Sequence, residues 1–196
     1  MINQAVILAG GMGKRLFPLT KNLPKPMAPV KNIPFLSYLI FTLKKQGIKK
    51  ILILVGYKSK KIINFYNNKK DISIKFSISS IKSDTGRRVL NANKLLDKEF
   101  LLLYGDNFWS PNLKRMYKKF KSKKAYISTT VFNNYFGTAE YGKENNVYVN
   151  KKSFVQKYDK KRVDKKLNGI DIGFFIVDKK FLKFFKEKRK NYSFEN

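Results

Sequence analysis

Four short runs rich in apolar residues constrain the fold of this 196-residue chain more than any other feature. Residues 4–9, 51–55 and 100–104 are almost entirely apolar, which is typical of strands buried on both faces of a sheet. Residues 72–78 alternate polar and apolar side chains, which predicts a strand with one wetter face. The first half of the chain therefore predicts a sheet of at least four strands.

The segments between and after these runs have apolar residues at helical spacing. Helices are predicted over residues 35–46, 60–66, 86–96 and 113–120, and Gly47 is a suitable C-cap for the first of them. Strands that alternate with helices form right-handed βαβ units. We therefore predict an α/β fold, a Rossmann-like three-layer α/β/α arrangement with a mostly parallel mixed sheet.

The second half of the chain is less regular. A strand is predicted over residues 125–131, a hairpin over 147–149 and 154–156, and a strand followed by a helix from 170–177 onward. Neither a linker nor an internal repeat interrupts the pattern. The sequence predicts a single domain over residues 1–196.

The composition excludes several kinds of chemistry. The chain has no cysteine and no histidine, so disulfides, thiolate metal sites, cysteine nucleophiles and histidine bases are excluded. Carboxylates, Lys, Arg, hydroxyl groups, backbone amides and an added metal remain. A hydrophobic fraction of 43% is enough for a core, which argues against a disordered basic tail.

The formal charge of +30 has two interpretations. Such a charge attracts polyanions, which points to nucleic-acid binding. However, only six of the 43 basic residues are Arg and the 37 Lys are spread from end to end, together with 18 Asn and 17 Ile. AT-rich codons produce this bias without any partner, so we favour composition over nucleic-acid binding. No apolar stretch approaches the ~20 residues of a membrane helix, and we predict a cytoplasmic protein without a membrane partner.

A glycine-rich segment follows the first predicted strand: Gly10, Gly11 and Gly13, and then two cations. Ligands bind at the carboxyl ends of strands in such sheets. The segment fits neither a Walker A loop, because Arg15 stands where Ser or Thr is needed, nor a dinucleotide fingerprint, because Leu16 replaces a small residue. Taken alone, it is either a cradle for a polyphosphate or a tight turn with two solvated cations.

The longer string resembles a family signature. Residues 10–20 read Gly-Gly-Met-Gly-Lys-Arg-Leu-Phe-Pro-Leu-Thr, and residues 24–27 read Pro-Lys-Pro-Met. This closely resembles the sugar-phosphate nucleotidyltransferases, and in particular their small members that activate heptose or amino-sugar 1-phosphates with a guanylyl or uridylyl group. The resemblance implies an enzyme that joins a nucleoside triphosphate to a sugar 1-phosphate, uses Mg²⁺ and releases pyrophosphate. The product is a nucleotide sugar for polysaccharide or glycoconjugate synthesis.

The resemblance also implies roles for individual residues. Arg15 would hold the triphosphate and Lys25 would bridge the reacting phosphates, which makes these two the catalytic candidates. The nucleotide-binding candidates are Leu8, Gly10, Gly11, Gly13, Lys14 and Gly86. Gly86 ends a segment, residues 83–86, that is similar to the family's base-contacting loop, but the two arginines at 87 and 88 depart from the pattern and leave the base undetermined.

Asp106 is the metal candidate. An Asp directly after a buried strand is by itself more often a turn or helix cap. The resemblance implies that it binds Mg²⁺, which prefers carboxylates and phosphate oxygens.

The sugar-phosphate candidates lie in the second half of the chain. Residues 154–158 resemble a family segment whose lysine contacts the sugar phosphate, so Lys157 is the candidate there. Asn168 and Gly169 resemble the start of the sugar-binding strand. We interpret Asp171, two residues further on, as structural.

The end of the chain departs from the family, whose members continue for some tens of residues past a segment like 192–195. That continuation carries a further strand and a second metal-binding Asp. The resemblance therefore implies a domain without its C-terminal segment, either a fragment or an enzyme with one carboxylate. The alternatives are a catalytically impaired nucleotide-binding or regulatory protein and a basic polyanion-binding protein. The sequence predicts no oligomeric state.

Overall fold

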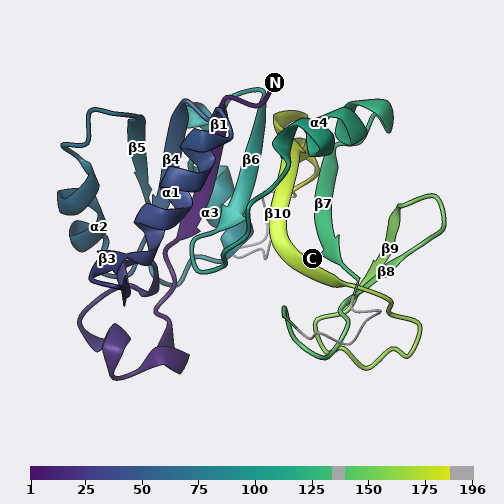
Figure 1. Ribbon diagram of the computed structural model, residues 1–196, viewed down its shortest axis with the longest axis horizontal. Helices are drawn as coiled ribbons and strands as arrows, with labels where there is room; N and C mark the ends of the chain where they lie inside the picture. The colour runs from purple at the N-terminus through teal and green to yellow at the C-terminus, as the bar shows by residue number, and fades with distance from the viewer. Residues whose placement is uncertain (134–139, 186–196) are drawn as a thin grey trace.

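The computed structural model describes residues 1–133 and 140–185, and a six-stranded sheet runs through its centre (Figure 1). The strand order is β5 (Ser73–Ile78), β4 (Lys50–Val55), β1 (Gln4–Ala9), β6 (Glu99–Tyr104), β10 (Ile170–Asp178) and β7 (Ile127–Phe132). The first four strands in this order are parallel, and β10 is antiparallel to both of its neighbours. The predicted mostly parallel mixed sheet is confirmed.

Helices cover both faces of the sheet because side chains alternate along each strand. On one face, Ala5 and Ile7 of β1 belong to the same buried cluster as residues of three helices, α1 (Phe35–Lys45), α2 (Ser59–Tyr66) and α4 (Leu113–Ser122). On the other face, Val6 and Leu8 pack in a cluster with α3 (Thr85–Asn91) and the 3₁₀ helix η5 (Lys179–Phe184). The predicted three-layer arrangement is confirmed.

Some boundaries differ from the prediction. The predicted helix 86–96 is α3 followed by a separate 3₁₀ turn, η4 (Asn93–Leu95), and the helix expected after β10 is the 3₁₀ helix η5. Strand β7 begins at Ile127 rather than at 125, because Lys124 has a positive φ of 49° and the amide of Ala125 still bonds to the carbonyl of Phe120 in α4.

The remaining elements are short. The predicted hairpin is β8 (Val147–Val149) paired antiparallel with β9 (Val155–Tyr158). Three 3₁₀ turns, η1 (Lys14–Leu16), η2 (Leu19–Lys21) and η3 (Lys25–Met27), precede a two-stranded ribbon of β2 (Pro29–Val30) and β3 (Ile33–Pro34). The segment 192–195 lies outside the described residues. Within the described residues, no helix is both long enough and apolar enough to cross a membrane.

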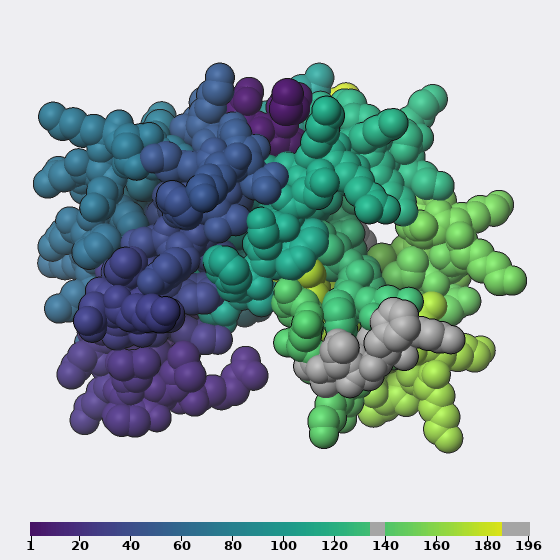
Figure 2. All heavy atoms as spheres, in the orientation of Figure 1, coloured from purple at the N-terminus to yellow at the C-terminus, as the bar shows by residue number. Residues whose placement is uncertain are grey.

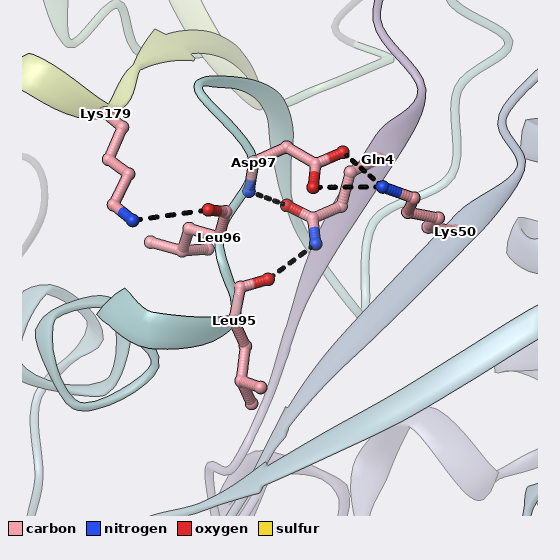
Figure 3. A network of polar contacts seen from close by, with 6 residues as sticks. All are labelled: Gln4, Lys50, Leu95, Leu96, Asp97 and Lys179. Carbon is pink, nitrogen blue, oxygen red and sulfur yellow. Dashed lines mark hydrogen bonds and ion pairs between the residues drawn. The ribbon is translucent and has the colours of Figure 1, made fainter.

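A polar network closes the amino end of β1 (Figure 3). The buried Gln4 donates from Nε2 to the carbonyl of Leu95 at 2.8 Å and accepts from the amide of Asp97 at 2.8 Å. The Asp97 carboxylate in turn pairs with Lys50 of β4 at 3.1 Å. The side-chain amide of Gln4 thus links β1 to the segment that leads into β6.

Candidate active site

The turn after β1 has a shape that a larger residue would disturb. Gly13 has φ +62°, in the left-handed region, and a Cβ there would lie 2.9 Å from Cβ of Lys25. Thr20, which is fully buried, donates from its hydroxyl to the carbonyl of Gly13 at 2.8 Å. The glycine turn and the Pro-Lys-Pro segment therefore pack directly against each other.

Tyr57, just after β4, connects the same loop to the sheet. Its backbone amide donates to the carbonyl of Gly10 at 3.1 Å, and its hydroxyl donates to the carbonyl of Lys21 at 3.0 Å. Both ends of the loop are thereby held at the carboxyl edge of the sheet. In Figure 2 the amino-terminal loop (purple) projects at the lower edge, and a hollow separates it from the second half of the chain (green).

Backbone donors remain free in this turn. Within residues 1–133 and 140–185, the N–H groups of Gly11, Met12 and Gly13 donate to no acceptor. Successive free amides in a turn of this kind form an anion-binding concavity. Of the two interpretations that the sequence left open for this loop, this geometry favours the phosphate cradle.

A cavity of about 400 Å³ opens over the turn. It is lined by residues from the signature, from the ends of β1 and β6 and from the segment before and within α3: Leu8, Ala9, Gly10, Gly11, Gly13, Lys14, Arg15, Leu16, Lys25, Pro26, Ile81, Ser83, Asp84, Thr85, Arg88, Tyr104 and Asp106. This lining includes four cationic side chains and two carboxylates. A site with this excess of positive charge suits a polyphosphate.

Lys25 and Asp106 form an ion pair inside this lining, although 81 residues separate them in sequence. The Nζ of Lys25 lies 2.6 Å from Oδ2 of Asp106, and the two side chains are 31% and 38% exposed. A pair this open to water adds little to folding stability, typically about 0–1 kcal/mol. Its two members thus neutralise each other at the mouth of the cavity, and both remain accessible to a ligand.

The donor set fits Mg²⁺ bound partly by a substrate. Mg²⁺ in phosphate sites takes one or two carboxylates and keeps phosphate oxygens and waters as its other ligands. Asp106 supplies one such carboxylate beside the free amides, and Asp84 is the second acid in the lining. In the described part of the chain, no group of three or more Asp or Glu residues is arranged so that it could hold a metal ion by itself.

With the site in view, comparisons with known proteins identify the family. Residues 4–195 match the family described as nucleotidyl transferase. The chain belongs to the nucleotidyl transferase family. The family expected from the signature is therefore confirmed.

Two relatives are named for the same reaction. The chain is 33% identical over 195 residues to the D-glycero-alpha-D-manno-heptose 1-phosphate guanylyltransferase of Campylobacter jejuni, with 98% of this chain and 83% of that protein covered. It is 38% identical over 127 residues to the protein of the same name from Aneurinibacillus thermoaerophilus, with 64% of this chain and 55% of that protein covered. The chain thus spans about half the length of the second relative.

A solved structure shares the fold. The crystal structure of HddC from Yersinia pseudotuberculosis, complexed with GMP-PN, superposes with a TM-score of 0.80 at 24% identity and covers 99% of this chain and 84% of that one. This likeness agrees with the three-layer arrangement described above.

Most of the predicted phosphate-handling residues of this nucleotidyl transferase lie together. Residues from both catalytic and nucleotide-binding predictions line the one cavity, as does the metal candidate: Leu8, Gly10, Gly11, Gly13, Lys14, Arg15, Lys25 and Asp106. Gly86 is buried in α3 and does not line it, whereas the preceding residues 83–85 do. Their roles stay predictions, but their shared location is a structural fact.

The predicted sugar-phosphate residues lie elsewhere. Lys157 is on β9, and its Nζ bonds to Asp164 at 2.5 Å. The side chain of Asn168 pairs with the backbone of Val149, accepting and donating at 2.8 Å. Neither lines the cavity.

Gly169, the third of these candidates, is also held by contacts within the protein. It is buried, and a Cβ there would lie 2.3 Å from Cγ1 of Val131. Its carbonyl accepts from the amides of Asn146 and Val147. Asn168 and Gly169 thus join β8 to the segment that leads into β10, and Lys157 pairs with the loop after β9. The sugar-phosphate role of all three residues stays a prediction.

The structural interpretation of Asp171 agrees with its contacts. Its carboxylate accepts from the hydroxyl of Thr129 at 2.7 Å, from the amide of Gly173 at 3.1 Å and from the hydroxyl of Tyr158 at 3.4 Å. Burial raises the pKa of Asp171, and burial followed by the nearby Asp171 charge raises the pKa of Tyr158 to about 12. The carboxylate joins β7, β9 and β10.

Arg88 and Tyr104 are among the lining residues that were not assigned a role from the sequence. Arg88 stood out only as a departure from the family pattern, yet its side chain is buried. Tyr104 lines the cavity, and its hydroxyl is buried without a hydrogen-bond partner within the described residues.

Proposed function

We propose that this chain transfers a nucleotidyl group from a nucleoside triphosphate to a sugar 1-phosphate and releases pyrophosphate. The observation that carries the proposal is the gathering of Arg15, Lys25 and the free amides of the glycine turn around one cavity that Asp106 also lines. The glycine turn follows β1 and Asp106 follows β6, two neighbouring parallel strands at whose carboxyl ends ligands of such sheets bind.

The reaction needs positioning and charge neutralisation rather than a covalent intermediate. A phosphate oxygen of the sugar 1-phosphate attacks the α-phosphorus and forms a new P–O bond. The bond from the α-phosphorus to the bridging oxygen of the β-phosphate breaks, and pyrophosphate leaves with that electron pair. Fixed cations and amide donors stabilise the charge that develops during such a transfer.

Each group has a part in that scheme. The amides of the glycine turn hold phosphate oxygens, and Arg15 binds the phosphates that become pyrophosphate. Lys25 gives up Asp106 and binds a phosphate oxygen when the substrates enter. Asp106 would hold Mg²⁺ together with phosphate oxygens, and the bound ion would neutralise and orient the triphosphate.

We further propose GTP as the donor and a heptose 1-phosphate as the acceptor. Both guanylyltransferases named above act on D-glycero-alpha-D-manno-heptose 1-phosphate, as their names state, and the Yersinia structure holds GMP-PN. Lys157, Asn168 and Gly169 are the candidates for the acceptor side. Binding of Mg²⁺, a cytoplasmic location and the absence of a nucleic-acid partner remain predictions.

Turnover tests the proposal. The protein is incubated with Mg²⁺, each of the four triphosphates and a panel of sugar 1-phosphates, and pyrophosphate is measured. We expect release with GTP and a heptose 1-phosphate, loss of release with EDTA, and loss in the Arg15→Ala variant. A folded protein that releases pyrophosphate with no pair would overturn the proposal.

The same samples test the two alternatives. A regulatory protein with an impaired site predicts that a triphosphate raises the melting temperature without any turnover. A polyanion-binding protein predicts tight nucleic-acid binding with a steep salt dependence that Arg15→Ala barely alters. Weak binding that disappears at moderate salt leaves only the attraction expected of any chain with a charge of +30.

A further inference from the structure

The side chain of Arg88 lies beneath the glycine turn. It is 4% exposed, and its Nη1 donates to the carbonyl of Val55 at the end of β4, 3.1 Å away. Its Nη2 donates to the carbonyls of Gly10 at 3.2 Å and Ser80 at 3.0 Å. One guanidinium thus connects the start of the turn, the end of β4 and the loop after β5.

The contact is so close that it requires glycine on both sides. A Cβ on Gly10 would lie 2.2 Å from Nη1 of Arg88, and a Cβ on Gly56 would lie 2.4 Å from the same atom. These separations are far shorter than a van der Waals contact. The guanidinium therefore fills the space that side chains at 10 and 56 would otherwise need.

The charge of Arg88 has no close counter-charge. No carboxylate of the described residues lies within 4 Å of it, and its hydrogen-bond acceptors are backbone carbonyls. Burial lowers the pKa of Arg88, and the more distant Asp84 opposes this shift. An arginine nevertheless stays protonated at neutral pH. A buried positive charge thus lies in the wall of the cavity that the glycine turn also lines.

We propose that Arg88 is a positioning residue for the triphosphate. Its fork of donors fixes the carbonyl of Gly10, so that the free amides of residues 11–13 point toward the phosphates, and its charge favours an anion there. The inference rests on the proposed function, because it deepens the role of the same cavity. It predicts a defect in nucleotide affinity, which a residue needed only for folding would not produce in the folded variant.

Three substitutions distinguish the hydrogen-bonding fork of Arg88 from its charge and from its packing volume. Arg88→Lys keeps the charge but replaces the planar fork, whose two terminal nitrogens reach different carbonyls, by a single nitrogen. Arg88→Met keeps most of the volume and removes both charge and fork. Arg87→Met is the matched control, because Arg87 is the neighbouring arginine on α3 and does not line the cavity. Melting curves and circular dichroism establish that each variant is folded.

Calorimetric titration with GTP and with inorganic tripolyphosphate, both with Mg²⁺, gives the readout. We expect Arg88→Met to raise both dissociation constants at least about tenfold and Arg88→Lys to raise them about as far, with Arg87→Met unchanged. The KM for GTP should rise more than kcat falls. Wild-type affinity in a folded Arg88→Met protein would overturn the proposal, and wild-type affinity in Arg88→Lys alone would overturn the role of the fork.

A second route covers the case in which Arg88→Met does not fold. Gly10→Ala places a Cβ against the guanidinium in the wild type, so it should weaken GTP binding at least about tenfold. In the Arg88→Lys background, where the terminal Nη atoms are absent, the same substitution should cost at most about threefold. Equal losses in the two backgrounds would contradict the proposed contact.

The outcomes also separate this inference from the proposed function. Arg88-dependent binding of GTP without pyrophosphate release leaves Arg88 as a positioning residue and overturns the transferase. Pyrophosphate release with KM and affinity that do not depend on Arg88 supports the transferase and overturns the role of Arg88. A wild type that neither binds GTP nor releases pyrophosphate overturns both.

Discussion

The two ends of β1 differ in whether their polar groups have partners within the protein. At the amino end, the neutral side chain of Gln4 has a partner for its donor and for its acceptor (Figure 3). At the carboxyl end, Arg88 carries a buried charge without a close carboxylate, and the amides of residues 11–13 are free within the described residues. At the amino end the side chain of Gln4 has its hydrogen-bond partners within the protein. At the carboxyl end, hydrogen-bond donors remain that an anion could accept from.

This difference separates stability from function along a single strand. A buried polar group that finds its partners in the protein supports the fold, and it costs free energy when a partner is removed. Donors without partners and charges without counter-charges work against stability, and they persist where a ligand completes them. The comparison therefore predicts that changes at the two ends affect different measurements.

The largest effect is expected at the carboxyl end, from Lys25→Ala. The loss of one fixed cation beside the reacting phosphates should lower kcat/KM for pyrophosphate release by about 10²–10³. Stability should change little, because the ion pair with Asp106 is open to water. Pyrophosphate assays and urea denaturation check both parts.

The control for that experiment is Lys21→Ala, an exposed lysine of the same loop that does not line the cavity. Its activity should match the wild type. An active Lys25→Ala protein would remove Lys25 from the catalytic groups.

At the amino end we expect the opposite result, a loss of stability without a loss of nucleotide binding. Gln4→Leu leaves the carbonyl of Leu95 and the amide of Asp97 without their partner, which should cost about 1–3 kcal/mol of unfolding free energy for a buried group. The affinity for GTP should not change. Urea denaturation and calorimetry measure the two quantities, and Gln46→Leu, at an exposed glutamine, is the reference. A change in GTP affinity without a loss of stability would contradict the division between the two ends.

A smaller effect concerns the hairpin. If Lys157 serves the sugar phosphate, Lys157→Ala should raise the KM for the sugar 1-phosphate about tenfold, the size expected for one charged contact. The KM for GTP should stay the same. Steady-state kinetics with each substrate varied in turn check this, with Lys165→Ala, an exposed lysine of the following loop, as control. Equal kinetics in the two variants would assign Lys157 only to its ion pair with Asp164.

The smallest effect depends on pH. Burial raises the pKa of Asp171 in the folded protein above its value in the unfolded chain. The folded state therefore favours the protonated form, and this contribution to stability is present at low pH and is lost as the pH rises through the folded pKa. Asp171→Asn, which is always neutral, should unfold at higher urea concentration than the wild type at pH 7.

This advantage should shrink as the pH falls to about 4, close to the pKa of an unperturbed aspartate. Denaturation curves of both proteins at the two pH values make the comparison. An advantage of the same size at both pH values would show that charge is not its cause.

The strands and the glycine-rich loop were predictable because their signals are local. The apolar runs place β1, β4 and β6, and the signature places Arg15 and Lys25 on one loop. The ion pair of Lys25 with Asp106 joins the Pro-Lys-Pro segment to the end of β6, and its geometry comes only from the fold.

The role of Arg88 was not predictable, because a charged residue in a basic chain is expected at the surface. Its burial depends on carbonyls of Gly10, Val55 and Ser80, three segments that only the folded chain brings together. The position of Lys157 was equally unpredictable from the sequence. It follows from the way the hairpin joins the sheet through the bridge of Val147 to Gly169, which no local pattern encodes.

Amide exchange at the two ends of β1 tests the central claim most directly. Exchange of the N–H groups of Gly11, Met12 and Gly13, followed by NMR with and without saturating GTP and Mg²⁺, reports whether the free donors bind phosphate. The amide of Asp97, which is already bonded to Gln4, is the internal reference. We predict at least about tenfold slower exchange at residues 11–13 and no change at Asp97. Unchanged exchange at residues 11–13 in the presence of bound GTP would contradict the account.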